Sequence, residues 1–190
     1  MDSKVVRAFL ALPLAQAFQA EVRPLIEILK NQYPDFRWVH AGEIHLTLHF
    51  FGSISTDEVG KIANLVRPLI LQRNSFQVSL AGIGAFPNSH HPRVIWLGMN
   101  DESGSLKSFQ AALEDSLKRA GFPTEAREFK PHLTLARLKK DAEKKHSSFH
   151  PSDFGPTFPK RIREVILFKS DLRPDGAHYE PIETFPLSAA

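Results

Sequence analysis

The chain has 190 residues, of which 42% are hydrophobic and 24% charged, a composition that is typical of a folded globular protein and excludes a disordered low-complexity chain. It contains no cysteine, which excludes disulfides, thiolate metal sites and a cysteine nucleophile, and which fits a reducing, cytoplasmic location. The formal net charge of +3 is compatible with a polyanionic partner but does not require one. The sequence predicts neither a signal peptide nor a membrane segment, because no apolar run approaches the ~20 residues that span a bilayer.

The spacing of apolar residues predicts strands and helices along the whole chain. An apolar run closed by Pro13 indicates the first strand, and apolar residues three and four positions apart indicate a first helix that Pro24 should weaken or kink. We expect strands at residues 5–12, 36–40, 44–51, 76–80, 93–99, 162–170 and 178–187, and helices at residues 14–32, 56–72 and 105–120.

Turn-forming and helix-capping residues mark the ends of these elements. Gly52 should end the third strand, and Thr56 is the expected N-cap of the second helix because two acidic residues follow it. Glycine, proline and polar residues predict a loop at residues 82–92, a surface loop at residues 139–159 and a turn at residues 174–176.

Two short stretches of the chain carry the same pattern, His-x-Thr-x. They are His45-Leu46-Thr47-Leu48 and His132-Leu133-Thr134-Leu135, the second within residues 128–138. Side chains alternate between the faces of a strand, so the histidine and threonine of each copy should share one face, ~7 Å apart, with both leucines on the other. One such copy is a weak signal, but two identical copies are much harder to attribute to chance.

The order of the expected elements also repeats: strand, helix, then a strand with the motif. His132 follows His45 by 87 residues, and the same interval separates Phe9 from Trp96 in the strands that open each half. The repeat predicts a duplicated α+β fold with two mainly antiparallel sheets, helices outside, a pseudo-two-fold axis and a central cleft. We expect residues 1–190 to form one bilobal domain, and a monomer, because one chain supplies both half-sites.

The paired motifs indicate acid–base chemistry. One imidazole can accept a proton from water while the other donates one to a leaving oxygen, since each titrates near pH ~6.5. The threonine hydroxyls can donate hydrogen bonds to an oxyanion. These groups suit in-line displacement at phosphorus and need no metal, cofactor or covalent intermediate. From spacing alone, the roles of the two histidines are interchangeable.

The motifs and the segments around them resemble a known family. The chain is similar to the two-histidine (2H) phosphoesterases, and most of all to RNA 2′,3′-cyclic phosphodiesterases of the 2′-5′ RNA ligase-like (LigT/ThpR) branch. The likeness lies in residues 7–13, 45–52, 93–98, 131–137 and 167–170, followed by Tyr179.

This resemblance implies hydrolysis of 2′,3′-cyclic phosphates at RNA 3′ ends, or of cyclic nucleotides, to 2′-phosphates. It implies that His45 is the proton donor to the 3′ oxygen and His132 the proton acceptor from water, with the roles exchanged in a reverse 2′-5′ ligation. It further implies that Thr47, Thr134 and Arg137 bind the phosphate and that no metal takes part. Strict alternation, however, places Arg137 on the face opposite His132, so it reaches the cleft only if the strand bulges or ends there.

Other residues of interest have competing interpretations. His49 lines the cleft if its strand stays regular, and the strand pattern argues against a metal pair with His45. Phe9 and Trp96 either stack on a base or belong to the core. The basic groups at residues 137–145 and 160–163 either follow an RNA backbone or are solvated surface. The remaining candidates are expected in loops, at His90, His91, His146, His150 and His178.

Two other functions stay open at this point. One is an RNA-binding module without turnover, against which the two intact motifs argue. The other keeps the catalytic groups but changes the substrate to 2′-5′ linkages or small cyclic nucleotides.

Overall fold

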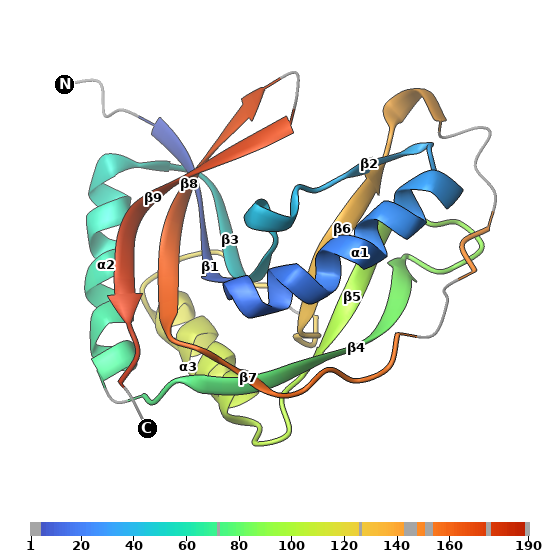
Figure 1. Cartoon of the computed structure of the whole chain (residues 1–190). Helices are drawn as coiled ribbons and strands as arrows, with labels where there is room; N and C mark the ends of the chain where they lie inside the picture. The colour runs from blue at the N-terminus through green and yellow to red at the C-terminus, as the bar shows by residue number, and fades with distance from the viewer. Residues whose placement is uncertain are drawn as a thin grey trace.

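A computed structural model describes residues 5–71, 73–125, 127–142, 148–150, 154–173 and 176–188. Within these ranges the chain forms two antiparallel sheets and three α-helices (Figure 1). The four-stranded sheet has the order β3 (His45–Ser55), β1 (Val5–Pro13), β8 (Glu164–Arg173) and β9 (Gly176–Pro186). The five-stranded sheet has the order β2 (Phe36–Trp38), β6 (His132–Leu138), β5 (Val94–Asn100), β4 (Phe76–Phe86) and β7 (Lys160–Ile162). The expected α+β class with antiparallel sheets is confirmed.

Two of the helices join the two sheets by crossing from one to the other. Helix α1 (Gln16–Gln32) follows β1 of the four-stranded sheet but packs on β2 of the five-stranded sheet. Helix α3 (Ser105–Arg119) follows β5 of the five-stranded sheet, lies beside α2 (Thr56–Leu71) and reaches β3 of the four-stranded sheet through a Glu114–His49 contact. Because α1 and α3 pack across the repeat, one continuous hydrophobic cluster underlies both sheets. No helix of the described residues is long and apolar enough to cross a bilayer.

Two strands run past the glycines at which the sequence predicted their ends. β3 continues beyond Gly52 to Ser55, and β4 includes Gly82 and Gly84, where a loop was predicted. Gly52 and Gly82 have φ of 71° and 72°, a left-handed conformation that suits glycine. Each lies beside a register shift in its ladder, so the glycine produces a β-bulge rather than a chain reversal.

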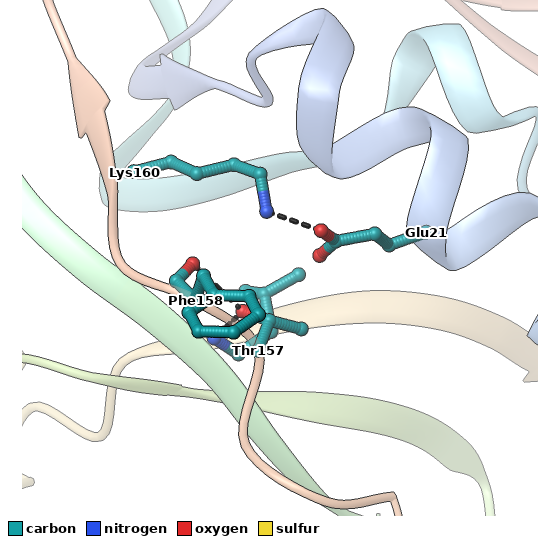
Figure 2. A network of polar contacts seen from close by, with 5 residues as sticks. Glu21, Thr157, Phe158 and Lys160 are labelled. Carbon is teal, nitrogen blue, oxygen red and sulfur yellow. Dashed lines mark hydrogen bonds and ion pairs between the residues drawn. The ribbon is translucent and has the colours of Figure 1, made fainter.

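The segment predicted as a surface loop at residues 139–159 is only partly one. Residues 140–142 form a short 3₁₀ helix (η2), and Phe149 is fully buried. Thr157 pairs with Leu80 of β4 by two hydrogen bonds of 2.9 Å, one from each backbone N–H. Figure 2 shows Lys160 of β7 paired with Glu21 of α1. This ion pair links α1 to the edge strand β7 of the five-stranded sheet. The basic residues at 144–145, like the turn at 174–175, lie outside the described residues.

The second helix is capped by Ser55, whereas the sequence predicted Thr56 as its cap. The backbone N–H of Glu58 donates to Ser55 Oγ at 3.3 Å, and the Ser55 N–H and hydroxyl donate to Glu58 Oε2 at 2.8 and 2.9 Å. This reciprocal arrangement is a capping box. Hydrogen bonds from Ser55 lower the pKa of the Glu58 carboxyl, which keeps it ionised at the positive end of the helix.

The substitution Ser55→Ala should therefore lower the free energy of unfolding by about 1 kcal/mol, the usual effect of losing an N-cap. Thr56→Ala is the matched control and should change it by less than about 0.5 kcal/mol, as surface substitutions do. Urea titration followed by circular dichroism measures both. An equal loss in the two variants would mean that the serine is not the cap.

Candidate active site

Each motif strand contains a β-bulge at the fourth motif residue. In the β1–β3 ladder Leu10 pairs with His49 and Ala11 with Thr47, so Leu48 is the extra residue. In the β5–β6 ladder Ile95 pairs with Ala136 and Trp96 with Thr134, so the extra residue is Leu135. The two bulges occupy equivalent positions of the repeat, which supports the duplication inferred from the sequence.

The bulge reverses which face the following residues occupy. Leu135 and Ala136 are both fully buried, and the alternation then resumes with Arg137 exposed. Arg137 therefore lies on the same face as His132 and Thr134, which is the condition that the sequence set for its joining the site. At the equivalent position of β3, Phe50 is 45% exposed beside the first motif.

The same reversal removes His49 from the site. Its side chain is buried, its ring lies 4.5 Å from that of Phe51, and its Nδ1 lies 2.8 Å from Glu114 of α3. His49 thus faces the helices behind the sheet. The interpretation of His49 as a cleft residue is wrong, because it depended on a regular strand.

The two motif histidines are held in the same way. Nδ1 of His45 lies 2.8 Å from the carbonyl oxygen of Glu43, and Nδ1 of His132 lies 2.6 Å from that of Lys130. A carbonyl oxygen only accepts hydrogen bonds, so each Nδ1 carries its proton. In both rings Nε2 is therefore the nitrogen that can exchange a proton.

The strands that carry the motifs meet at the junction of the two sheets. Residues of β3 and β6 approach within 8 Å, Cα to Cα (Figure 1). The Arg137 guanidinium on β6 acts electrostatically on both His45 and Tyr179, which belong to the other sheet. The structure thus brings His45, Arg137 and Tyr179 together. Thr47 is exposed and Thr134 half-buried, each two residues along from its histidine.

Aromatic side chains enclose His45. Its ring centroid lies 4.8 Å from Phe9, 5.0 Å from Tyr179 and 6.3 Å from Phe168. Phe9 is 3% exposed, yet it packs on the motif face rather than within the main hydrophobic cluster. The sequence quoted Tyr179 and Phe168 only as part of a resemblance, because a role for them depends on strand pairing between distant segments.

His132 has a different aromatic environment. Phe86 lies 5.1 Å and Trp96 6.4 Å from its ring, centroid to centroid. A side chain at Gly84 would lie 2.2 Å from the Trp96 ring, so only glycine lets the indole lie over β4. Trp96 pairs with Thr134 as Ala11 pairs with Thr47, so Trp96 is the structural equivalent of Ala11 and not of Phe9. The expected match of Phe9 with Trp96 is therefore two residues out of register.

Burial and charge act on two titratable groups here. Burial lowers the pKa of His45, a hydrogen bond to the Glu43 carbonyl opposes this, and the positive charge of Arg137 lowers it further. Burial also raises the pKa of the Tyr179 hydroxyl, against the effect of Arg137, so the phenol stays neutral and can donate a hydrogen bond. These effects together favour the neutral imidazole at His45.

A cavity of about 280 Å³ opens beside His132. It is lined by three aromatic rings, two lysines and a glutamate: Phe86, Trp96, Phe129, Lys107, Lys130 and Glu128, together with Pro131. The indole N–H of Trp96 is buried without a hydrogen-bond partner among the described residues. A larger cavity of about 660 Å³ lies between α1 and β2 and contains none of the motif residues, so size alone would point away from the site.

Among the described residues, no group of three or more histidines and carboxylates is placed to hold a metal ion. His45 and His49 do lie on a strand, as expected. His90, His91 and His150 lie outside helices and strands, also as expected, whereas His178 lies in β9 and not in a loop. His146 falls outside the described residues.

The chain belongs to the 2′-5′ RNA ligase superfamily, whose family model matches residues 15–173. It is 32% identical over 184 residues to a Methanothermobacter thermautotrophicus protein named RNA 2′,3′-cyclic phosphodiesterase, covering 96% of this chain and 99% of that one. A protein of the same name from Archaeoglobus fulgidus is 30% identical over 186 residues, covering 95% and 99%.

Solved structures show the same fold. A protein from Thermus thermophilus superimposes with a TM-score of 0.83 at 25% identity, covering 96% of this chain and 98% of that chain. Escherichia coli LigT complexed with 3′-AMP superimposes with a TM-score of 0.75 at 25% identity, covering 97% and 99%. The resemblance seen in the motifs is confirmed at the level of the family and the fold.

The charge relation across the sheets can be tested by titration. Arg137→Ala removes a positive charge that disfavours imidazolium, so the pKa of His45 should rise toward its ordinary value, while burial still holds it below. Arg137→Lys keeps the charge and is the matched control. NMR of the imidazole resonances against pH measures both, and an unchanged pKa of His45 in Arg137→Ala would contradict this arrangement.

Proposed function

We propose that the protein hydrolyses 2′,3′-cyclic phosphates at RNA 3′ ends to 2′-phosphates, using His45 and His132 as the proton-transfer pair. The observation that carries the proposal is that both rings are fixed through Nδ1 to a carbonyl two residues earlier, which leaves both Nε2 atoms for proton exchange. The relatives' name, RNA 2′,3′-cyclic phosphodiesterase, supports the same substrate class.

In the proposed reaction, Nε2 of neutral His132 accepts a proton from water as its oxygen attacks the phosphorus. The bond from phosphorus to the 3′ oxygen breaks, and Nε2–H of protonated His45 donates its proton to that oxygen. Thr47 and Thr134 hydroxyls donate hydrogen bonds to the non-bridging oxygens, and the Arg137 guanidinium neutralises charge on them. Proton exchange with solvent restores both histidines, and the same steps with a 5′-hydroxyl in place of water would form a 2′-5′ linkage.

The lowered pKa of His45 bears on how this ring acquires its proton. Burial and the nearby guanidinium disfavour imidazolium when the site is empty. A bound phosphodiester brings a negative charge to the same place and raises the pKa of the imidazole. We therefore propose that substrate binding is what loads the proton on His45, so that the acid is formed where it is needed.

We extend the proposal to the assembly and the location of this chain. Residues 1–190 would act as one bilobal, monomeric unit, because each half supplies a His-Thr pair to the same reaction. The absence of cysteine fits a cytoplasmic protein that meets RNA ends in a reducing compartment. Analytical ultracentrifugation tests the monomer.

Replacing either histidine should remove most of the activity. His45→Ala and His132→Ala are each expected to lower kcat by at least ~10²-fold on a nucleoside 2′,3′-cyclic phosphate, the usual contribution of a general acid or base. Asparagine at either position is a second substitution, one that retains a polar side chain. The matched control is His91→Ala, at an exposed position in a loop.

Product analysis by phosphorus NMR checks these variants on a panel of cyclic nucleotides, RNA ends and 2′-5′ linkages. The wild type should show a bell-shaped pH profile and resist chelators. Full activity in both histidine variants would refute the proposal. RNA binding without turnover at any pH would instead establish the binding-module alternative, and turnover confined to another substrate would establish that substrate.

The threonine hydroxyls should act mainly on the transition state. Thr134→Val keeps the shape and β-propensity of the side chain but removes the donor, so kcat should fall by ~10²-fold with little change in KM. Thr184→Val, exposed on β9, is the control for the same substitution elsewhere in a strand. A change confined to KM would show that the hydroxyl binds substrate and transition state equally well.

A further inference from the structure

Two arginines lie directly opposite each other on neighbouring strands at the edge of the five-stranded sheet. In the antiparallel β2–β6 ladder Arg37 pairs with Arg137. Residues opposite each other in such a ladder share a face, with Cβ atoms about 5 Å apart. Like charges in this relation destabilise a sheet, so the arrangement calls for a compensating partner.

The residues beside Arg37 show independently which face it occupies. Phe36 is 4% exposed in the hydrophobic cluster, and the Trp38 indole donates to the Tyr33 carbonyl at the end of α1. Both therefore lie on the helix side of β2. Arg37 alternates with them and is exposed on the opposite face. That face also holds Arg137, whose charge reaches His45 in the other sheet.

Neither guanidinium has an acidic partner among the residues that the structure describes. Among the described residues, the ion pairs involve other basic groups, such as the pair between Arg67 and Glu183. Among the same described residues, no hydrogen bond joins Arg37 or Arg137 to another side chain. Two guanidiniums side by side, one of them next to the candidate phosphate site, are suited to bind anions.

The two arginines differ in their distance from the motifs. Arg137 is on the motif strand, whereas Arg37 is one strand further out, on the edge strand β2. Neighbouring strands are about 4.8 Å apart, so the two forks can contact two different phosphates of one chain. A cyclic mononucleotide offers only the reacting phosphate, but an RNA end offers a second phosphodiester one nucleotide upstream.

We propose that Arg37 binds the phosphodiester that precedes the terminal cyclic phosphate and so makes the site favour polynucleotide ends over cyclic mononucleotides. This inference rests on the proposed function and adds a backbone subsite to it. Arg137 then binds the reacting phosphate of every substrate, and Arg37 binds only substrates that have an upstream phosphate.

The test compares a nucleoside 2′,3′-cyclic phosphate with an oligoribonucleotide that ends in the same group. Arg37→Ala should lower kcat/KM for the oligonucleotide by about tenfold or more, the usual effect of losing a charge-assisted contact, and should leave the mononucleotide within about twofold. Arg37→Lys should retain part of the preference. The matched control is Arg119→Ala, which removes an exposed arginine on α3.

Salt dependence provides a second measurement. For the oligonucleotide, the plot of log kcat/KM against log salt should become shallower by about 0.7 in Arg37→Ala, as expected for one lost phosphate contact on a single strand. Equal effects on the two substrates, or none on either, would overturn the inference. Circular dichroism melting of Arg37→Ala and Arg37→Lys shows whether the fold is intact.

Failure of the proposed function gives a different result. If the wild type hydrolyses neither substrate, the proposed reaction is wrong, and the subsite is then tested by binding alone. Arg37→Ala should still bind an oligoribonucleotide 2′-phosphate about tenfold more weakly than the wild type, with a mononucleoside 2′-phosphate unaffected. Equal affinities for the oligonucleotide would overturn the subsite.

Discussion

One extra residue in each motif strand determines the composition of the site. A regular β3 would place His49 beside His45, and a regular β6 would turn Arg137 toward α1. Leu48 and Leu135 are inserted as bulges. Both leucines of each motif therefore stay in the core, and the residues that follow still change to the other face of the sheet. The same backbone irregularity thus excludes a histidine from one half-site and adds a guanidinium to the other.

The two half-sites share their backbone geometry but not their surroundings. Both histidines are fixed through Nδ1 to the carbonyl two residues earlier, which is a property of the repeated strand. The ring of His45 is enclosed by aromatic side chains from β1, β8 and β9, whereas His132 borders an open cavity of about 280 Å³. Since β8 and β9 lie outside the repeat, this asymmetry comes from the C-terminal hairpin. A duplicated pair can then take two roles, because its two rings lie in different surroundings and burial lowers the pKa of His45.

Much of the fold and the two motifs could be predicted from the sequence, because strand and helix periods are local properties. The predictions were wrong where the local structure depended on contacts with residues elsewhere in the fold. Gly52 and Gly82 look like strand ends in the sequence, but the partner strands continue past them and the glycines form bulges instead. The sequence predicted Thr56 as the cap of α2, but the cap is Ser55, because the carboxylate of Glu58 completes a capping box with Ser55.

The candidate site residues that the sequence missed are those that depend on contacts between distant segments. Arg37 carries no motif, and its position becomes informative only when the β2–β6 register places it opposite Arg137. The electrostatic consequence extends beyond that pair. Adjacent guanidiniums repel each other, and Arg137 also disfavours the protonated form of His45, so the site contains unfavourable interactions between positive charges. In the proposed reaction an anion at this surface would relieve all of them together, and phosphate binding would then be coupled to the protonation of His45.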